Sequence, residues 1–280
     1  MASTDCFRQT HLGPLVILVL WLAGCVPYQQ LARQQDLQQQ LLPGERFLHR
    51  IFTNTAARCA TPASRWHVYI EGDGHAVTPQ GRPAADPTPR SPLLLPMMAR
   101  DPAPALYLGR PCYFDTADPQ CHPGQWTLAR YSEDTVASMA AVLRQQLPAS
   151  SPVTLIGHSG GGTLAVLLAP RLPQVDRVVT LAGNLAVARW TTYHDYTPLD
   201  RSLDPSQAPP LPPSIAQCHL AATADREILP QWIQAYAATQ PRAHFVPVPE
   251  TRHDRGWRPW WTLISSEPII KASGCDKVTR

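Results

Sequence analysis

The residues best suited to chemistry form the pentapeptide GHSGG at positions 157–161. The apolar run 153–156 leads into it, and a Leu/Ala-rich run follows it. This strand-turn-helix setting activates serines, because glycines two residues to either side let strand and helix approach around a strained turn. The amide of Gly160, at the start of the helix, is a donor suited to a developing oxyanion. The pattern predicts a nucleophile at Ser159.

Glycine-rich turns between strand and helix also bind phosphate, which is the alternative interpretation of this turn. The turn has no lysine to neutralise a phosphate, and it lacks the GxGxxG spacing of a dinucleotide site. The spacings of cysteine and histidine match no zinc motif. We therefore expect no cofactor and no metal. The net charge is only +3, and the basic residues are scattered, so nucleic acid is not an expected partner.

A serine nucleophile needs a general base, and the base needs an acid that orients it. Asp225 and His253 each follow an apolar, strand-like run later in the chain than Ser159. This placement predicts His253 as the base and Asp225 as the acid. Asp254 and Glu227 are the nearest substitutes if Asp225 faces away. The alternatives are that Asp225 caps the following helix and that His253 is a surface histidine.

Together, these segments resemble the α/β-hydrolase superfamily, in which the nucleophile, acid and base follow one another in this order. The resemblance covers about residues 65–261 and implies a catalytic triad of Ser159, Asp225 and His253. It implies hydrolysis of a small-molecule or lipid acyl substrate, an ester or thioester, through an acyl-enzyme. A non-catalytic binding protein on the same scaffold and a serine peptidase remain as alternatives.

A second oxyanion donor is expected in the loop after an early strand, at Gly72-Asp73-Gly74. Many members of the superfamily carry His-Gly here, whereas this chain has Glu71-Gly72. The donating amide therefore stays open between Asp73 and Gly74, alongside that of Gly160. The carboxylates of Glu71 and Asp73 would oppose negative charge, so we expect them to point away or to be hydrogen-bonded. The glycines are also compatible with a plain turn.

Apolar runs alternate with helical patterns along the chain, which predicts an α/β fold: a mostly parallel sheet with helices on both faces. The predicted strands are Trp66–Glu71, Ala105–Leu108, Val153–Ile156, Arg177–Leu181, His219–Thr223 and His244–Val248. The predicted helices are Glu133–Leu147, Gly162–Arg171, Pro230–Thr239 and Trp260–Ser266. One α/β-hydrolase domain, residues 61–280, accounts for this rhythm.

Proline is unusually abundant, at 31 of 280 residues, about twice its ordinary usage. So many prolines exclude a coiled coil or a helical solenoid. Many of them fall in two stretches that interrupt the strand-helix rhythm, residues 78–123 and 190–213, which we expect to be long Pro-rich loops. In the second stretch, Trp190, Tyr193 and Tyr196 either line a substrate pocket or pack the loop onto the body of the domain.

The amino-terminal segment, residues 1–24, resembles a bacterial lipoprotein signal peptide. A short apolar run ends in LAGC at residues 22–25, which implies cleavage before Cys25 and its lipidation. The lipid would anchor the chain to the membrane, and Val26 in place of Asp favours an outer-membrane position facing the periplasm. Residues 25–60 would then form a lipidated, glutamine-rich tether. An ordinary secretory peptide or an uncleaved anchor is the alternative.

An oxidising compartment permits disulfides, and Cys112 and Cys121 flank a short Pro-rich loop. We therefore predict a disulfide between these two residues. A pairing of Cys218 with Cys275 is possible, but the sequence does not fix the partners of Cys59, Cys218 and Cys275.

Overall fold

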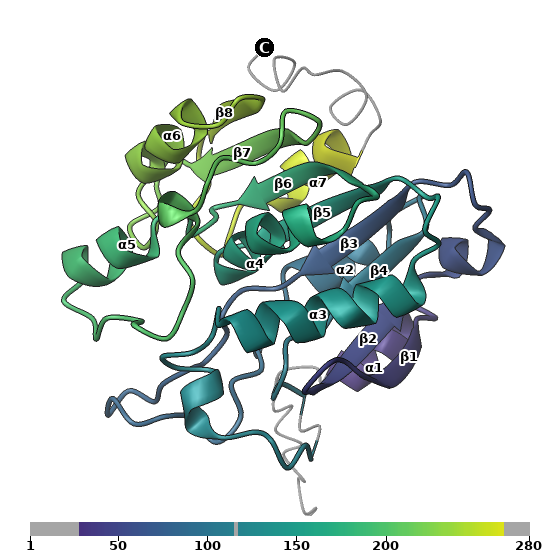
Figure 1. Cartoon of the computed structure of the whole chain (residues 1–280), viewed down its shortest axis with the longest axis horizontal. Helices are drawn as coiled ribbons and strands as arrows, with labels where there is room; N and C mark the ends of the chain where they lie inside the picture. The colour runs from purple at the N-terminus through teal and green to yellow at the C-terminus, as the bar shows by residue number, and fades with distance from the viewer. Residues whose placement is uncertain (1–27, 115–116, 266–280) are drawn as a thin grey trace, which may run out of the picture.

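A computed structural model describes residues 28–114 and 117–265, with backbone only for 262–265 (Figure 1). In this part of the chain, eight strands form one sheet in the order β1-β2-β4-β3-β5-β6-β7-β8. From β4 to β8 neighbouring strands are parallel, whereas β2 is antiparallel to both β1 and β4. The strands are β1 (Gln38–Pro43), β2 (Leu48–Thr53), β3 (Trp66–Ile70), β4 (Ala105–Leu108), β5 (Val153–His158), β6 (Val175–Leu181), β7 (Ala216–Ala222) and β8 (Ala243–Val248). The predicted α/β fold is confirmed.

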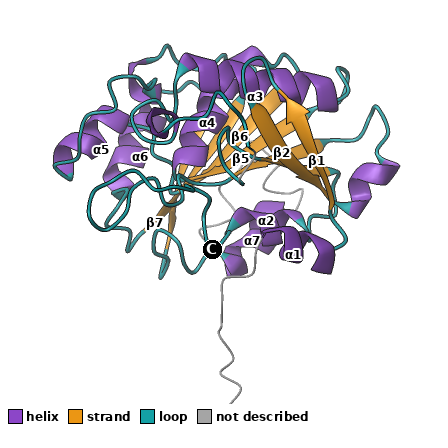
Figure 2. Ribbon diagram, turned by 90° about the horizontal axis from the view of Figure 1, so that it is seen from below, coloured by secondary structure: helices purple, strands orange, loops and turns teal. Residues whose placement is uncertain are grey.

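Helices cover both faces of this sheet (Figure 2). The helices are α1 (Tyr28–Gln34), α2 (Leu94–Met98), α3 (Glu133–Gln146), α4 (Gly160–Leu168), α5 (Val187–Tyr193), α6 (Pro230–Ala238) and α7 (Arg258–Ser265). One face carries α3, α4 and α6, and the other carries α1, α2 and α7. Of these helices, none in the described part of the chain is long and apolar enough to cross a membrane.

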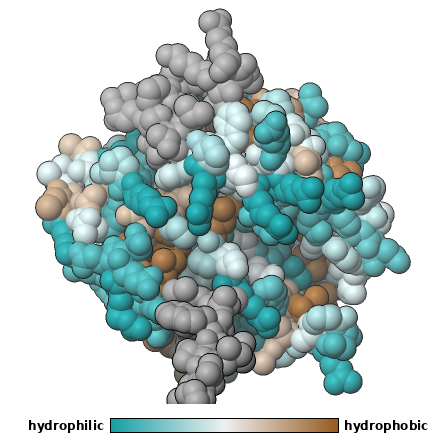
Figure 3. Space-filling model, turned by 180° about the vertical axis from the view of Figure 1, so that it is seen from behind, coloured by the Kyte–Doolittle hydropathy of each residue, from teal (hydrophilic) through white to brown (hydrophobic). Residues whose placement is uncertain are grey.

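Alternation along the strands divides the core into two layers, because successive side chains point to opposite faces of a sheet. In β3, Val68 and Ile70 pack in the layer under α3 and α4, whereas Tyr69 packs in the layer under α1, α2 and α7. In β5, Leu155 and Ile156 divide in the same way. Burial on both faces explains why these strands read as continuous apolar runs in the sequence. The face seen in Figure 3 is mostly hydrophilic, with apolar residues in small groups.

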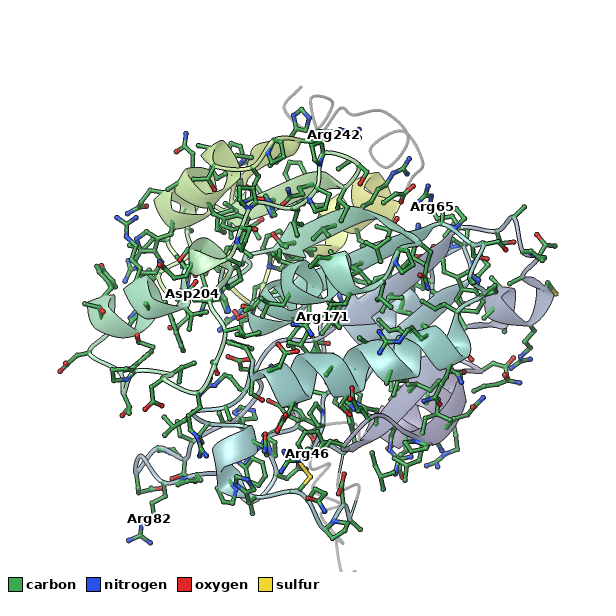
Figure 4. The ribbon with its side chains drawn as sticks, viewed as in Figure 1. Arg46, Arg65, Arg82, Arg171, Asp204 and Arg242 are labelled. Atoms are coloured by element: carbon green, nitrogen blue, oxygen red, sulfur yellow. A yellow bond between two sulfur atoms is a disulfide. The ribbon has the colours of Figure 1, made fainter. Side chains whose placement is uncertain are left out.

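Local signals fix the ends of the main helices. Ser132 caps α3 by accepting a hydrogen bond from the amide of Thr135, and two acidic residues follow in the first turn. Pro230 begins α6, where a missing amide hydrogen costs nothing. On the surface, α3 is linked to the 3-10 turn that follows α4, Ala169–Arg171, by an ion pair between Glu133 and Arg171, which is labelled in Figure 4.

The structure differs from the predicted tether at residues 25–60. Residues 38–53 form β1 and β2, and β2 pairs with β4 inside the sheet. Ile51 and Phe52 are fully buried, whereas β1 is an edge strand whose residues are almost all exposed. An exposed edge strand needs no apolar face, so its glutamines gave no strand signal. The globular domain therefore begins before residue 61.

The predicted disulfide between Cys112 and Cys121 is present. Cys59 is an exposed free thiol. Cys25 and Cys275 lie outside the described residues, as does the signal segment 1–24. The lipidation of Cys25 and the pairing of Cys218 with Cys275 therefore remain predictions.

Candidate active site

Ser159 lies in a strained turn between β5 and α4. Its backbone angles are φ 51° and ψ −122°, a conformation that costs free energy for any residue with a side chain. A Cβ on Gly157 would overlap the carbonyl of Gly161, and a Cβ on Gly161 would overlap the carbonyl of Ile70. Both glycines are therefore required by close backbone approach. The carbonyl of Ser159 accepts hydrogen bonds from the amides of Gly162 and, at 3.1 Å, Asn184, which hold the turn in place.

The structure brings Ser159, His253 and Asp225 together at the carboxyl edge of the sheet. Oγ of Ser159 lies 3.0 Å from Nε2 of His253, and Nδ1 of His253 lies 2.8 Å from Oδ2 of Asp225. This geometry fits a neutral imidazole that donates from Nδ1 and accepts the serine proton at Nε2. The imidazole is 24% exposed, and the Asp225 side chain is fully buried. The acid is thus shielded while the base is open to substrate.

Asp225 does not cap the following helix, because α6 begins after Leu229 with no side-chain cap. While Oδ2 faces the histidine, Oδ1 accepts hydrogen bonds from the amides of Glu227 and Ile228, at 2.8 and 3.1 Å. The same carboxylate therefore closes its own loop and orients the histidine. The substitutes are used elsewhere, because Glu227 accepts a hydrogen bond from Nε1 of Trp190 and Asp254 lies exposed beside Arg255.

Two side chains to which the sequence assigned no role in the site, His158 and Trp257, hold the histidine loop. Nε2 of His158 donates to the carbonyl of His253 at 2.8 Å, and Nε1 of Trp257 donates to the same oxygen at 3.0 Å. Burial lowers the pKa of His158 to about 4, so its ring is neutral near pH 7 and donates from this one nitrogen. His158 is part of the GHSGG motif, but a histidine at this position does not by itself predict a hydrogen bond to the carbonyl of His253.

The three amides considered for the oxyanion are those of Asp73, Gly74 and Gly160. Among the described residues, none accepts a hydrogen bond from any of these amides. A Cβ on Gly72 would lie 3.3 Å from Cβ of Ser159, so the peptide that carries the Asp73 amide lies against the serine. Gly74, at φ 63°, instead packs against the carbonyl of residue 87. The geometry favours Asp73 as the partner of Gly160.

Both nearby carboxylates are hydrogen-bonded, as expected. Oε2 of Glu71 accepts the amide of Leu94 at the start of α2. Burial raises the pKa of Glu71 to about 7. The carboxylate of Asp73 is bound by Arg110, Arg130 and Tyr131. Neither carboxylate is therefore a free negative charge beside Ser159.

Ser159 and His253 line a pocket of about 1220 Å³. Its walls come from both Pro-rich stretches. One residue of each stretch is labelled in Figure 4: Arg82, which is exposed and points to solvent, and Asp204. Asp204 is not itself in the wall, but its carboxylate accepts the amide of Ala188 at 2.8 Å and so ties the second stretch to α5.

Of the three aromatic residues considered for the pocket, two line it. Trp190 and Tyr196 lie in the wall, with ring centroids 5.2 Å apart. Tyr193 packs on Trp232 and is 61% exposed. Residues 187–193 form a short helix, α5, rather than an irregular loop. Trp190 and Tyr196 thus line the pocket, whereas Tyr193 packs the segment onto the body of the domain.

Comparisons with known proteins agree with this fold. The family model described as alpha/beta hydrolase fold matches residues 112–209. An esterase from the Planctomycetes species Thermogutta terrifontis, bound to propionate, is 14% identical, with 84% of this chain and 94% of that chain covered at a TM-score of 0.56. Est1E from Butyrivibrio proteoclasticus is 11% identical over 83% of this chain and 98% of that chain, with a TM-score of 0.55.

An esterase from Pyrococcus furiosus is 9% identical over 87% of this chain and 96% of that chain, again with a TM-score of 0.56. No protein of curated function matches the sequence. At these identities, the likeness concerns the fold.

Proposed function

Because the chain has the α/β-hydrolase fold, we propose that it is a serine hydrolase that cleaves carboxylic esters or thioesters. The observation that carries the proposal is the continuous hydrogen-bonded chain from Ser159 through His253 to the buried Asp225. It begins at a serine held at positive φ and opens into a large pocket. The solved esterases with the same fold support this reaction class.

The proposed reaction has two halves. Oγ of Ser159 attacks the carbonyl carbon, its proton passes to Nε2 of His253, and the carbonyl electron pair moves onto oxygen. The amides of Gly160 and Asp73 hold this oxyanion, while Asp225 stabilises the imidazolium. Collapse expels the alcohol or thiol, which takes the proton from His253. Water then attacks the acyl-enzyme with His253 as base, which releases the acid and restores Ser159.

The substrate belongs to the class of small-molecule or lipid acyl compounds. A pocket of about 1220 Å³ exceeds the usual range for small ligands, about 300–1,000 Å³. Its walls include apolar side chains such as Val77, Leu93 and Ile228. A panel of acyl esters of graded chain length, assayed on a soluble form that begins at Val26, identifies the preferred acyl length.

A fluorophosphonate probe tests the mechanism, because it labels only an activated serine. We expect labelling and ester hydrolysis in the wild-type protein and in Ser64→Ala, which removes a partly exposed hydroxyl just before β3, outside the pocket lining. Both should be lost in Ser159→Ala. A well-folded wild-type protein that takes no label and cleaves no ester would instead be a binding protein on a hydrolase scaffold.

The membrane tether is the second part of the proposal. It rests on the LAGC sequence that ends the apolar segment, and the disulfide between Cys112 and Cys121 fits an oxidising compartment such as the periplasm. In a bacterial host fed an alkyne-tagged fatty acid, the full chain should carry the tag and sediment with membranes. Cys25→Ser should lose the tag, whereas the control Cys59→Ser should keep it. A tag retained in Cys25→Ser would contradict the tether.

A further inference from the structure

Asp73 occupies an unusual place for a carboxylate, beside the residue that follows the nucleophile. It lies in the loop after β3 and lines the pocket with Ser159. A Cβ on Gly160 would overlap Oδ1 of Asp73 and the hydroxyl of Tyr131. The side chain of Asp73 therefore packs directly against the start of α4, the segment that carries the amide of Gly160.

The carboxylate of Asp73 is held by three side chains from two other segments. Arg110 binds Oδ1, and Oδ2 accepts from Arg130 at 2.9 Å and from the Tyr131 hydroxyl at 2.5 Å. The backbone carbonyl of Asp73 accepts a further hydrogen bond, at 2.9 Å, from the hydroxyl of Tyr113. Side chain and main chain of the same residue are thus fixed by separate hydrogen bonds.

These partners are themselves immobilised. Arg110, Tyr113 and Tyr131 are at most 3% exposed. The guanidinium of Arg110 lies over the rings of both tyrosines, and its NH2 donates to the carbonyl of Arg130. Tyr113 follows Cys112, so the disulfide to Cys121 ties its segment down. We call Asp73, Arg110, Tyr113, Arg130 and Tyr131 the Asp73 clamp.

The clamp is a poor device for stability alone. Burying two guanidinium groups with one carboxylate leaves a net charge of +1, and desolvation of buried ions offsets much of their attraction. Although burial alone would raise the pKa of Asp73, the two guanidinium groups hold it well below its usual value. The carboxylate therefore stays ionised and bound at any pH at which a serine hydrolase works.

We propose that Asp73 is a positioning residue of the oxyanion site: its clamped side chain and carbonyl hold its own backbone amide against Ser159 and Gly160. The inference rests on the proposed serine hydrolase function. Loop amides stabilise an oxyanion only when they are held in place before the reaction, since small displacements weaken such hydrogen bonds steeply. In this chain a buried ion cluster supplies that rigidity after Glu71-Gly72.

The first test is Asp73→Asn, which keeps the shape of the side chain and removes its charge. Because the donor acts mainly on the transition state, we expect kcat to fall about 10- to 100-fold while KM changes less than about 3-fold. The matched control is Asp101→Asn, a buried carboxylate that binds His67 and Tyr69 at the other end of β3. The control should lower the melting temperature and leave kcat unchanged.

The second test is Tyr113→Phe, which removes one hydroxyl from the carbonyl of Asp73 and keeps the ring stacked on Arg110. We expect kcat to fall about 3- to 10-fold with at most a small fall in melting temperature, because Asp73 is partly exposed to the pocket. Tyr107→Phe is the matched control, because Tyr107 is also buried and its hydroxyl bonds only Tyr28 in the described residues. If Asp73→Asn fails to fold, Tyr113→Phe alone tests whether the clamp positions the Asp73 amide.

A trifluoromethyl ketone separates positioning from general loosening. Ser159 adds to its carbonyl and forms a hemiketal whose oxyanion occupies the proposed site, so its affinity should fall in step with kcat in both clamp variants. Unchanged kcat and unchanged ketone affinity in Tyr113→Phe would overturn the proposal. A wild-type protein that hydrolyses no ester and takes no fluorophosphonate fails earlier, at the proposed function, and so the two failures differ.

Discussion

Two serine-histidine pairs in this protein have nearly the same geometry and very different surroundings. Oγ of Ser138, in α3, lies 2.8 Å from Nε2 of His49, in β2, and Oγ of Ser159 lies 3.0 Å from Nε2 of His253. In both pairs the other ring nitrogen, Nδ1, has an oxygen partner, so both histidines are set to accept the serine proton. A short hydrogen bond between serine and histidine does not by itself identify a nucleophile.

What separates the pairs is everything around the hydrogen bond. Nδ1 of His49 donates to the carbonyl of Gly109, whereas Nδ1 of His253 donates to a carboxylate. Ser138 and His49 are fully buried, and Oγ of Ser138 also accepts the amide of Phe47 at 3.1 Å. The first pair therefore has no carboxylate bonded to Nδ1 to stabilise an imidazolium, no access for substrate and a serine oxygen already in use. It serves to join α3 to β2.

The largest contrast is expected from removing each hydroxyl. Ser159→Ala should lower kcat by about 10⁴-fold or more, because the nucleophile itself is lost. Ser138→Ala should keep kcat and lose about 1–3 kcal/mol of unfolding free energy, since partners of the buried hydroxyl are left unpaired. Ester hydrolysis and denaturant titration of both variants measure this. Activity loss in Ser138→Ala with retained fold would refute the distinction.

The next contrast concerns the partner of the second ring nitrogen. In Asp225→Asn the amide can donate to Nδ1, which favours the tautomer with its proton on Nε2, and kcat should fall about 10³- to 10⁴-fold. Fluorophosphonate labelling should slow in parallel while the melting temperature changes little. A fall in kcat of no more than about 10-fold would mean that Nδ1 of His253 needs only a neutral oxygen partner. The carboxylate would then not be what distinguishes His253 from His49.

Buried histidines should make stability depend on pH. Burial lowers the folded-state pKa of His49 to about 4 and that of His219 to about 3, below the unfolded value of about 6.5. The unfolded chain therefore binds more protons below pH 6.5, so unfolding free energy should fall as the pH drops from about 6.5 towards 4. Each group contributes up to about 1.4 kcal/mol per pH unit.

Denaturant titrations across this pH range measure the slope. His49→Gln should reduce the slope of unfolding free energy against pH by the contribution of His49, whatever the effect of the substitution on stability at pH 7. An unchanged slope in that variant would mean that His49 is protonated in the folded protein, contrary to its buried, neutral role.

The contrast between the pairs also shows which parts of the site can be predicted from the sequence. The glycines around Ser159 and the strand-end positions of Asp225 and His253 are local signals, because each depends on a neighbouring strand or turn. They sufficed for the fold and for the residues that now lie within hydrogen-bonding distance. The pair of Ser138 and His49 had no such signal, since its members come from a helix and a strand about 90 residues apart.

The clamp around Asp73 escaped prediction for the same reason. Arg110, Arg130 and Tyr131 come from the ends of loops whose sequence shows no periodicity, and they meet Asp73 only once the sheet is assembled. The sequence required only that the carboxylate be satisfied. The missed strands β1 and β2 show the same limit: β1 is an exposed edge strand with no apolar pattern, and β2 is recognised only through its pairing with β1 and β4.

The smallest effect is expected at His158, whose ring bonds the backbone of the loop that carries His253. His158→Leu removes the hydrogen bond to the carbonyl of His253, but Trp257 still donates to the same oxygen at 3.0 Å. The loop should therefore stay in place on average and lose precision, and we expect kcat to fall about 3- to 10-fold at constant KM. His158→Gln, which returns a donor near the position of Nε2, should recover most of that loss. If Leu and Gln gave equal rates, the contact would be mere packing, and the loop that carries His253 would owe its position to Trp257 and Asp225 alone.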